Sequence, residues 1–363
     1  MNSSSTRTQQ TFYPSLEFWL NLIGAKIAYE YLNFYFILIV SLVGFFLNST
    51  SLLILTRKSL FTSTDFYKFM RVYTLNSMIL SLFLASTFVT TSYRFLSISS
   101  SYARSLFYVY VYVPFLCYFY LNSSLLEICM VFERISYFLP TRNRIIKKIG
   151  FKKLCLVVFS LSALVNSINY TLYTPSFLDA AVDENTVYRL FFLTYSAFSL
   201  TLGGKVLAYV MYFFRDILTM VIKLVLNGMS VVLLRSYLTK LKKEKRTFAE
   251  RISSGSQLQS ANVQAADSTY ISRTDRNQTL VALIMCTFSL LEHVFYVPSY
   301  VFFIINISDL ALVLYCLGLT SLCLKQVAGF IILYKFNSLF RKELREIYSN
   351  SLKRMKCMVK NEE

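Results

Sequence analysis

Long apolar stretches separated by short polar ones run through the chain. Seven of them come close to or exceed the length of about 20 apolar residues that an α-helix needs to cross the hydrocarbon core of a bilayer. They cover residues 34–56, 68–91, 106–132, 153–173, 206–234, 279–305 and 310–334. Transmembrane β-strands would alternate apolar and polar residues over about 10 positions, whereas these stretches are apolar on every face. The pattern predicts an all-α integral membrane protein, a bundle of seven transmembrane helices.

The composition supports this prediction. Hydrophobic residues make up 55% of the 363 residues and charged residues only 15%, which is more apolar surface than one soluble core of this length requires. The net charge of +18 would indicate a nucleic-acid partner in a soluble protein. In a membrane protein the distribution of that charge between the loops decides its meaning.

Basic residues gather after the first, third, fifth and seventh apolar stretches and are sparse in the other loops. They are Arg57, Lys58, Arg142, Arg144, Lys147, Lys148, Lys240, Lys242, Lys243, Lys245, Arg246, Arg341, Lys342, Arg345, Lys353, Arg354 and Lys356. Because cytoplasmic loops carry such an excess of Lys and Arg, we expect the amino terminus outside the cell. The charge then serves topology and attraction to membrane lipids, and no nucleic-acid partner is expected.

Three regions follow from this reading. Residues 1–33 form an extracellular amino-terminal segment, residues 34–335 the seven-helix domain, and residues 336–363 an amphipathic helix with a cytoplasmic tail. Apolar residues at positions 336, 339, 340, 344 and 347 fall at helical spacing, so this eighth helix is expected to lie in the membrane interface. Residues 240–277 contain many serines and few aromatic residues, which predicts a largely disordered cytoplasmic loop.

Two positions are candidates for covalent modification. Asn2 begins the sequon Asn2-Ser3-Ser4 on the expected outer side and is a candidate for glycosylation. Cys357 lies among basic residues just past the amphipathic segment and is a candidate for palmitoylation. None of the seven cysteines falls in an expected outer loop, so no extracellular disulfide framework is predicted.

Glu133 and Arg134 stand at the inner end of the third apolar stretch. Charged side chains inside or at the rim of a membrane helix are costly, so they mark a functional site by default. A carboxylate next to an arginine allows a charge-assisted hydrogen bond between the two. An isolated arginine extending its side chain to the interface is the alternative reading.

Several motifs, in this order and spacing, resemble those of rhodopsin-like (class A) G-protein-coupled receptors. They are Leu47-Asn48 within Gly44–Leu55, Phe132-Glu133-Arg134-Ile135, Tyr296-Val297-Pro298, and Phe340-Arg341. The chain departs from that family where Gly329–Tyr334 replaces the seventh-helix Asn-Pro-x-x-Tyr motif. The second-helix aspartate and the outer cysteine of the third helix also lack counterparts. The chain resembles a divergent invertebrate chemosensory or peptide-receptor-like member.

The resemblance implies a function and partners. A receptor of this family sits in the plasma membrane, senses an extracellular small molecule or peptide, and activates a heterotrimeric G protein. Glu133 and Arg134 would then form the coupling switch, in which Glu133 holds Arg134 until an agonist opens the inner ends of the fifth and sixth helices. Such opening is a shift between two packings of the bundle.

Four further polar residues fall inside the apolar stretches: Glu127, Glu292, His293 and Lys325. Each charged residue alone would cost about 2.5–3.5 kcal/mol at a helix centre on insertion scales. We therefore expect an intramembrane polar network in which Lys325 bridges Glu127 and Glu292. The alternative is that these residues face separate water-filled gaps or become neutral through shifted pKa values.

Aromatic residues suit a ligand pocket, and four are candidates: Tyr110, Tyr118, Tyr296 and Tyr300. They would line a site for an amine, a peptide or an odorant equally well, and aromatic side chains also serve as packing within a bundle.

Other function classes find less support. A transporter or channel is the main alternative, but a transporter should show an internal repeat, and the first three and last three stretches are not similar. A light receptor needs a retinal-binding lysine six residues before the seventh-helix Asn, whereas Lys325 precedes Gly329 by only four. His293 is the only histidine and stands in no metal or nucleophile constellation, so we expect neither an enzyme nor a cofactor nor a metal site.

Overall fold

The structure is a computed structural model, and it describes residues 32–57, 60, 64–91, 102–138, 149–183, 186–253, 258–304 and 308–360. Its elements in chain order are η1 (Leu32–Ile37), α2 (Leu38–Leu55), α4 (Asp65–Thr91), α5 (Tyr102–Phe107), η3 (Tyr108–Tyr112), α6 (Val113–Phe138), α8 (Phe151–Ser167), α9 (Asn169–Leu172), β1 (Tyr173–Asp183), β2 (Thr186–Tyr195), α10 (Ala197–Leu200), α11 (Leu202–Tyr212), η4 (Phe213–Leu218), α12 (Thr219–Ser253), α13 (Leu258–Ile304), α14 (Ser308–Phe336) and α15 (Ser338–Lys360). The η elements are short π-helical turns that continue into the neighbouring α-helices.

Among the described residues, seven helical segments are long and apolar enough to cross a membrane, and this confirms the predicted seven-helix architecture. They are Tyr35–Leu55, Asp65–Ser86, Ser105–Phe138, Phe151–Leu172, Leu202–Lys240, Arg276–Phe302 and Val313–Phe336. Large apolar side chains such as Phe46, Leu164 and Leu202 point away from the bundle and are 66%, 70% and 80% exposed. Such a surface suits contact with lipid tails.

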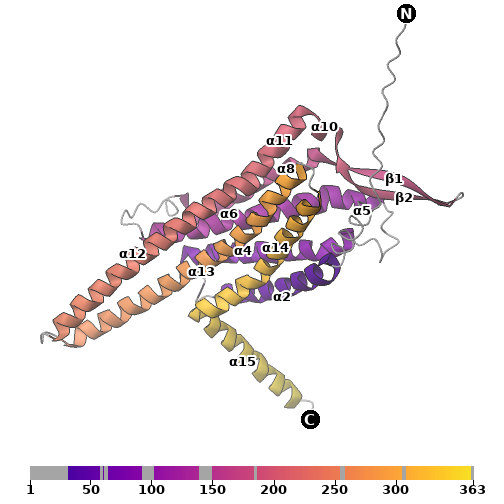
Figure 1. The fold of residues 1–363 in the computed structure, drawn as a ribbon. Coiled ribbons are helices and arrows are strands. Elements are labelled where there is room, and N and C mark those ends of the chain that lie inside the picture. Colours follow the sequence, from indigo (N-terminus) through magenta and orange to yellow (C-terminus); the bar gives the residue numbers. More distant parts are fainter. Residues whose placement is uncertain are drawn as a thin grey trace, which may run out of the picture.

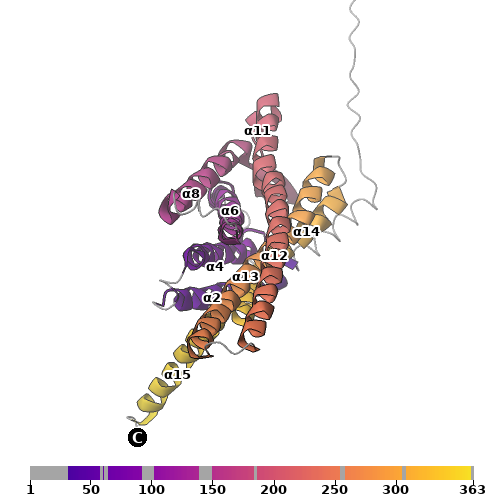
Figure 2. The ribbon, with the colours of Figure 1, turned by 90° about the vertical axis from the view of Figure 1, so that its left-hand side faces the viewer.

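The bundle has two distinct ends. The antiparallel β1–β2 hairpin lies at one end, and α12 and α13 extend side by side well beyond the helices at the other (Figures 1 and 2). Following the orientation expected from the basic residues, we call the hairpin end the outer end and the opposite end the inner end. The helix α15 starts at the inner end of α14 and runs off at an angle to the bundle (Figure 1).

The hairpin is an element that the sequence analysis missed. Its strands pair from Tyr173 with Tyr195 to Asp183 with Thr186. The sequence carries a signal for it, because the β-branched and aromatic run of residues 186–195 follows the polar turn residues Asp183-Glu184-Asn185, a pattern typical of hairpins.

The predicted disordered loop at residues 240–277 also differs from the structure. Helix α12 continues to Ser253 and α13 already begins at Leu258. The segment is rich in Lys, Glu, Ala, Gln and Arg, all strong helix formers. A shortage of aromatic residues indicates that a segment has little core to bury, and this does not prevent a helix from forming.

Two apolar clusters fill the interior. The larger cluster occupies the inner half and includes Phe66, Met130, Met285 and Phe340, whereas the smaller one in the outer half is centred on Tyr120 and Tyr296. Buried side chains in both clusters come from several helices, so the clusters hold the bundle together.

Close approach of α2 and α14 depends on a glycine in the Gly-Asn signature. A Cβ atom at Gly44 would lie 3.1 Å from the Cβ atom of Gln326, tighter than ordinary packing allows. The Asn48 amide donates to the carbonyls of Gly44 and Gln326 at 2.8 and 3.1 Å. The first and seventh membrane helices are therefore joined by a hydrogen bond from the Asn48 side chain to the backbone of α14.

Candidate functional site

The inner end of the bundle contains the Glu133–Arg134 pair. Helix α6 continues to Phe138, so the pair lies inside the helix and not at its end. Arg134 is 1% exposed. Its Nε and Nη2 atoms donate to the two carboxylate oxygens of Glu133, the second at 2.6 Å, and its guanidinium lies 5.1 Å from the Phe66 ring centroid. The positive charge of Arg134 is therefore bound by a bidentate ion pair and lies against an aromatic ring.

Arg134 also binds a second helix. Its Nη1 atom donates to Oε1 of Gln278 on α13. The sequence analysis missed Gln278 because it began the sixth stretch one residue later, at position 279. The helix in fact begins much earlier, and a polar residue on the buried face of its inner part is the signal that could have identified it.

A cluster of four charged residues lies deeper in the bundle. Lys325 Nζ is 3.0 Å from Glu127 Oε1 and 3.4 Å from Glu292 Oε2, while Lys223 Nζ is 2.9 Å from Glu127 Oε2. None of the four is more than 3% exposed. The structure therefore brings together three of the four residues expected in the polar network, and it adds Lys223.

Lys223 was not among the predicted site residues, although its position in the sequence indicates a functional role. It stands within the fifth apolar stretch, where a lone lysine marks a functional position by the same argument that selected Lys325. Two ammonium groups and two carboxylates make the cluster neutral, and close pairing compensates the cost of removing the charges from water.

Ser289 connects the two lysines. Its hydroxyl oxygen accepts hydrogen bonds from Lys223 Nζ and, at 3.0 Å, from Lys325 Nζ. Lys223 also donates to Ser124 Oγ at 2.9 Å. Side chains from α6, α12, α13 and α14 therefore meet at one point of the bundle.

His293 lies beside this cluster without pairing with any of its charges. Its Nδ1 atom is 2.8 Å from the Ser289 carbonyl oxygen, which can only accept a hydrogen bond, so Nδ1 carries the hydrogen. The Nε2 atom then accepts, and the hydroxyls of Thr219 and Tyr120 lie 3.1 and 3.4 Å from it. The histidine thereby connects the charged cluster to the outer half of the bundle.

A cavity of 70 Å³ opens in the outer half. It is lined by Leu116, Cys117, Tyr120, Arg215, Asp216, Tyr296, Tyr300, Tyr315 and Leu322. Of the four tyrosines named as pocket candidates, Tyr296 and Tyr300 line it. Tyr118 instead packs edge-on against Phe119 with ring centroids 5.2 Å apart, and Tyr110 is 38% exposed on η3.

The cavity wall holds a second arginine–carboxylate pair that the sequence analysis overlooked. Arg215 donates from Nε and Nη2 to Asp216 Oδ2 at 3.0 and 2.8 Å. It also donates to the Tyr300 hydroxyl at 2.8 Å and to the Cys117 sulfur at 3.2 Å. The two charged residues are only 4% and 2% exposed.

The signal for this pair was present in the sequence, because two adjacent charges interrupt the fifth apolar stretch. In the structure they occupy η4, a π-helical turn, which is a local geometry found often at functional sites.

The remaining candidates lie outside what the structure describes. Asn2 belongs to residues 1–31, and Cys357 is in α15 but its side chain is not described. The six cysteines whose side chains are described are free thiols. Among the described ranges no group of three His, Cys, Asp or Glu side chains is placed to hold a metal ion.

Comparison with known proteins establishes the fold. Neither the protein-family models nor the curated protein sequences match the chain. Among solved structures, the crystal structure of squid rhodopsin is similar, with a TM-score of 0.58 and 14% sequence identity over 90% of this chain and 87% of that one. The chain therefore has the seven-helix fold of rhodopsin-like receptors.

Proposed function

We propose that this chain is a G-protein-coupled receptor of the plasma membrane that senses an extracellular ligand and activates a heterotrimeric G protein by opening the inner ends of the bundle. One observation carries the proposal. Arg134 at the inner end is buried, paired with the adjacent Glu133 and bonded to Gln278 on α13. Such an arrangement is complete only while the inner ends of α6 and α13 stay together.

The contacts of α13 explain how the two ends of the bundle would be coupled. Cationic side chains of other helices bind α13 at three levels: Arg134 at Gln278, Lys325 at Ser289 and Glu292, and Arg215 at Tyr300. At a rise of 1.5 Å per residue, the outermost and innermost of these positions are about 33 Å apart. Movement of one helix therefore affects all three sites.

The outer cavity supplies the place where a ligand would act. A volume of 70 Å³ is well below the roughly 300–1,000 Å³ of typical small-molecule sites. A ligand must therefore move the cavity wall, and the hydrogen bond from Arg215 to Tyr300 joins η4 to α13 across that wall. Breaking this bond would favour the packing in which α13 has moved.

A series of polar contacts connects the outer cavity with the charged cluster. The Thr219 hydroxyl has one hydrogen, so it donates to one of its neighbouring acceptors at a time. Thr219 Oγ1 lies 3.2 Å from the carbonyl oxygen of Asp216 and 3.1 Å from His293 Nε2. His293 in turn binds the carbonyl of Ser289, whose hydroxyl accepts from both lysines. These contacts are physically contiguous and offer a route by which a rearrangement at the cavity would reach the charged cluster.

The orientation rests on the Lys and Arg distribution. An epitope tag at residue 2 should stain in intact cells, and a tag at Ser260 should stain only after permeabilisation. The reverse staining pattern would contradict the orientation and the receptor function together.

Arg134→Ala tests the function itself. A screen of a ligand library in cells with promiscuous G proteins first supplies an agonist. The variant should then lose agonist-stimulated nucleotide exchange while surface expression stays close to that of the parent. Arg235→Ala is the matched control, because Arg235 is an exposed arginine on the inner part of α12. Unchanged exchange in Arg134→Ala, or equal loss in both variants, would reject the role.

A further inference from the structure

The junction of α14 and α15 forms a basic cavity that the receptor function does not use. It has a volume of 650 Å³ and is lined by Tyr334, Ser338, Arg341, Lys342, Arg345, Glu346 and Ser349. Its lining thus offers three cationic side chains, three hydroxyl groups and a single carboxylate. This donor-rich composition suits an anion that accepts several hydrogen bonds.

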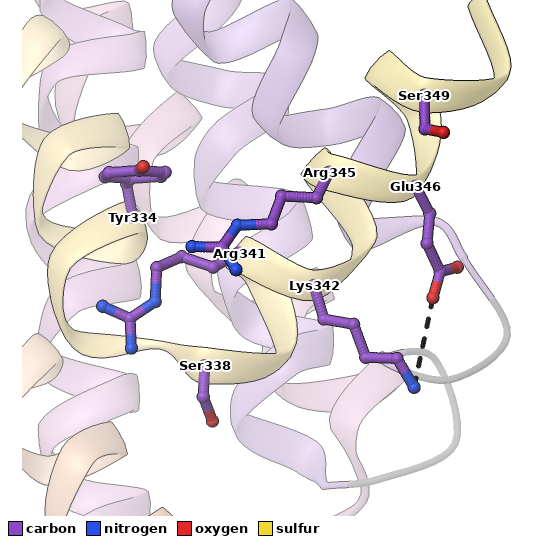
Figure 3. A pocket seen from close by; sticks show the side chains of 7 residues that line it. All are labelled: Tyr334, Ser338, Arg341, Lys342, Arg345, Glu346 and Ser349. Carbon is purple, nitrogen blue, oxygen red and sulfur yellow. Dashed lines mark ion pairs between the residues drawn. The ribbon is translucent and has the colours of Figure 1, made fainter. Parts of the chain in front are cut away.

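The positive charge in the cavity is unevenly compensated. Lys342 lies 4.0 Å from Glu346 one turn further along α15, so its charge is partly balanced. Arg341 and Arg345, also one turn apart, extend to the other side of the helix toward Tyr334 of α14 (Figure 3). Within the described part of the chain neither arginine forms an ion pair, and Arg341 donates instead to the carbonyl oxygen of Lys335 at 2.9 Å.

Two guanidinium groups that line one cavity match phosphate well. Each guanidinium presents a planar fork of N–H donors that can bind two phosphate oxygens at once. A carboxylate has only two oxygens to offer, so it would use fewer of these donors.

The cavity is held in place by the junction. Asn337 donates from its amide to the Tyr67 hydroxyl at 2.8 Å, and its side-chain oxygen accepts from the Phe340 backbone N–H at 3.1 Å. Phe340 is fully buried and meets Phe330 of α14 edge-on, with ring centroids 5.7 Å apart. The first turn of α15 is therefore anchored to the bundle, which preorganises the arginines that follow it.

The position of the cavity favours a lipid over a soluble anion. The seventh membrane-length segment ends at Phe336, so the cavity lies at the level where lipid headgroups meet the inner membrane surface. On the same helix Ile331 and Tyr334 are 55% and 43% exposed, and they offer an apolar surface for acyl chains next to the cavity. Helix α15 also carries seven basic and only two acidic residues, which attracts anionic lipids in general.

We infer that this junction is a binding site for the phosphorylated headgroup of an anionic membrane lipid, with Arg341 and Arg345 as its phosphate-binding residues. The site is independent of the proposed receptor function, since it requires neither an agonist nor a G protein. It is specific for phosphate groups, whereas the rest of α15 supplies only a general attraction to negative surfaces.

Lipid binding by the full-length purified chain tests the inference. The chain is placed in phosphatidylcholine nanodiscs that contain either a phosphatidylinositol bisphosphate or phosphatidylserine at equal total charge, and bound lipid is counted by native mass spectrometry. We expect the bisphosphate lipid to bind more strongly. Arg341→Gln combined with Arg345→Gln should weaken this binding by about tenfold or more.

The matched control removes two exposed basic residues at the inner end of α8, as Lys152→Gln with Lys153→Gln, which do not line the cavity. It should weaken bisphosphate binding far less than the arginine pair does. Equal loss in both double variants would overturn the site in favour of diffuse charge attraction. Equal binding of phosphatidylserine and the bisphosphate lipid would overturn its phosphate specificity.

A soluble competitor separates the two possible sources of phosphate. Free inositol trisphosphate should displace the lipid only weakly, because it lacks acyl chains to lie against α14. Displacement at concentrations equal to those of the lipid would mean that the site takes a soluble anion. The single variant Arg345→Gln, whose side chain is exposed, provides a version that retains the fold and should show an intermediate loss.

Discussion

Two buried arginines, Arg134 at the inner end and Arg215 in the outer half, have the same kinds of contact, but their carboxylate partners differ in exposure to water. Each pairs with a carboxylate adjacent in sequence, lies against aromatic rings, and donates a hydrogen bond to α13. At the inner pair the Glu133 side chain is 15% exposed, whereas at the outer pair the Asp216 side chain is 2% exposed.

This difference in carboxylate exposure predicts how each ion pair responds when its two partners are separated. The Glu133 carboxylate already reaches water, so it remains solvated when the pair opens, and the inner pair is suited to breaking and re-forming. The outer pair is enclosed by protein apart from the small cavity that it lines, and removing one partner leaves an uncompensated buried charge. The outer pair therefore contributes to stability, while the inner pair sets the balance between two packings.

The largest effect is expected at the outer pair. Asp216→Leu should lower the free energy of unfolding by about 3–5 kcal/mol, because Arg215 remains buried without its carboxylate. The combination with Arg215→Met should recover most of the loss, since both charges are then replaced by apolar groups. Denaturation in mixed detergent micelles measures both variants. A double variant no more stable than Asp216→Leu would refute the pairing.

The charged cluster between the two arginines comes next. Lys325→Glu places three carboxylates against Lys223 alone and should reduce surface expression or raise basal signalling. Glu292→Lys or Glu127→Lys in the same molecule should partly restore it, with a coupling energy of about 0.5–3 kcal/mol. Flow cytometry of a surface tag, together with basal nucleotide exchange, gives the readout. Double variants that equal the sum of the single effects would exclude the network.

A smaller effect is expected at the inner contact with α13. Gln278→Leu removes the acceptor of the Arg134 hydrogen bond, a charged bond contributing about 1.5 kcal/mol or more. Basal nucleotide exchange should therefore rise about tenfold if the packing equilibrium follows that energy. Asn277→Leu makes the same polar-to-apolar change at the neighbouring residue and should leave exchange near the parental level. An unchanged rate in Gln278→Leu would separate this contact from the switch.

The smallest effect tests the comparison most directly. Glu133→Gln should lower the free energy of unfolding by only about 1 kcal/mol, because the new amide keeps an oxygen acceptor beside Arg134 and Gln278 continues to bind it. Asp216→Asn, the equivalent change at the outer pair, should cost several times more under the same conditions. Equal losses for the two substitutions would show that their different exposure has no energetic consequence.

Much of the architecture could be read from the sequence. The seven helices and the eighth amphipathic helix follow from local apolar patterning, because burial in lipid or at its interface is a property that each segment has by itself. The hairpin and the inner extensions of α12 and α13 escaped this reading. Their signals are turn chemistry and helix propensity, which the search for apolar stretches does not detect.

The sequence by itself determined which residues had to find partners, since any charge in an apolar stretch is costly alone. Only the tertiary structure decided which partners meet. Arg134 and Gln278 are 144 residues apart in the chain, Lys223 and Ser289 are 66 apart, and Arg215 and Tyr300 are 85 apart. Each meeting depends on how the helices are rotated and how deeply they are set against one another, and this is fixed by side-chain packing across the whole bundle.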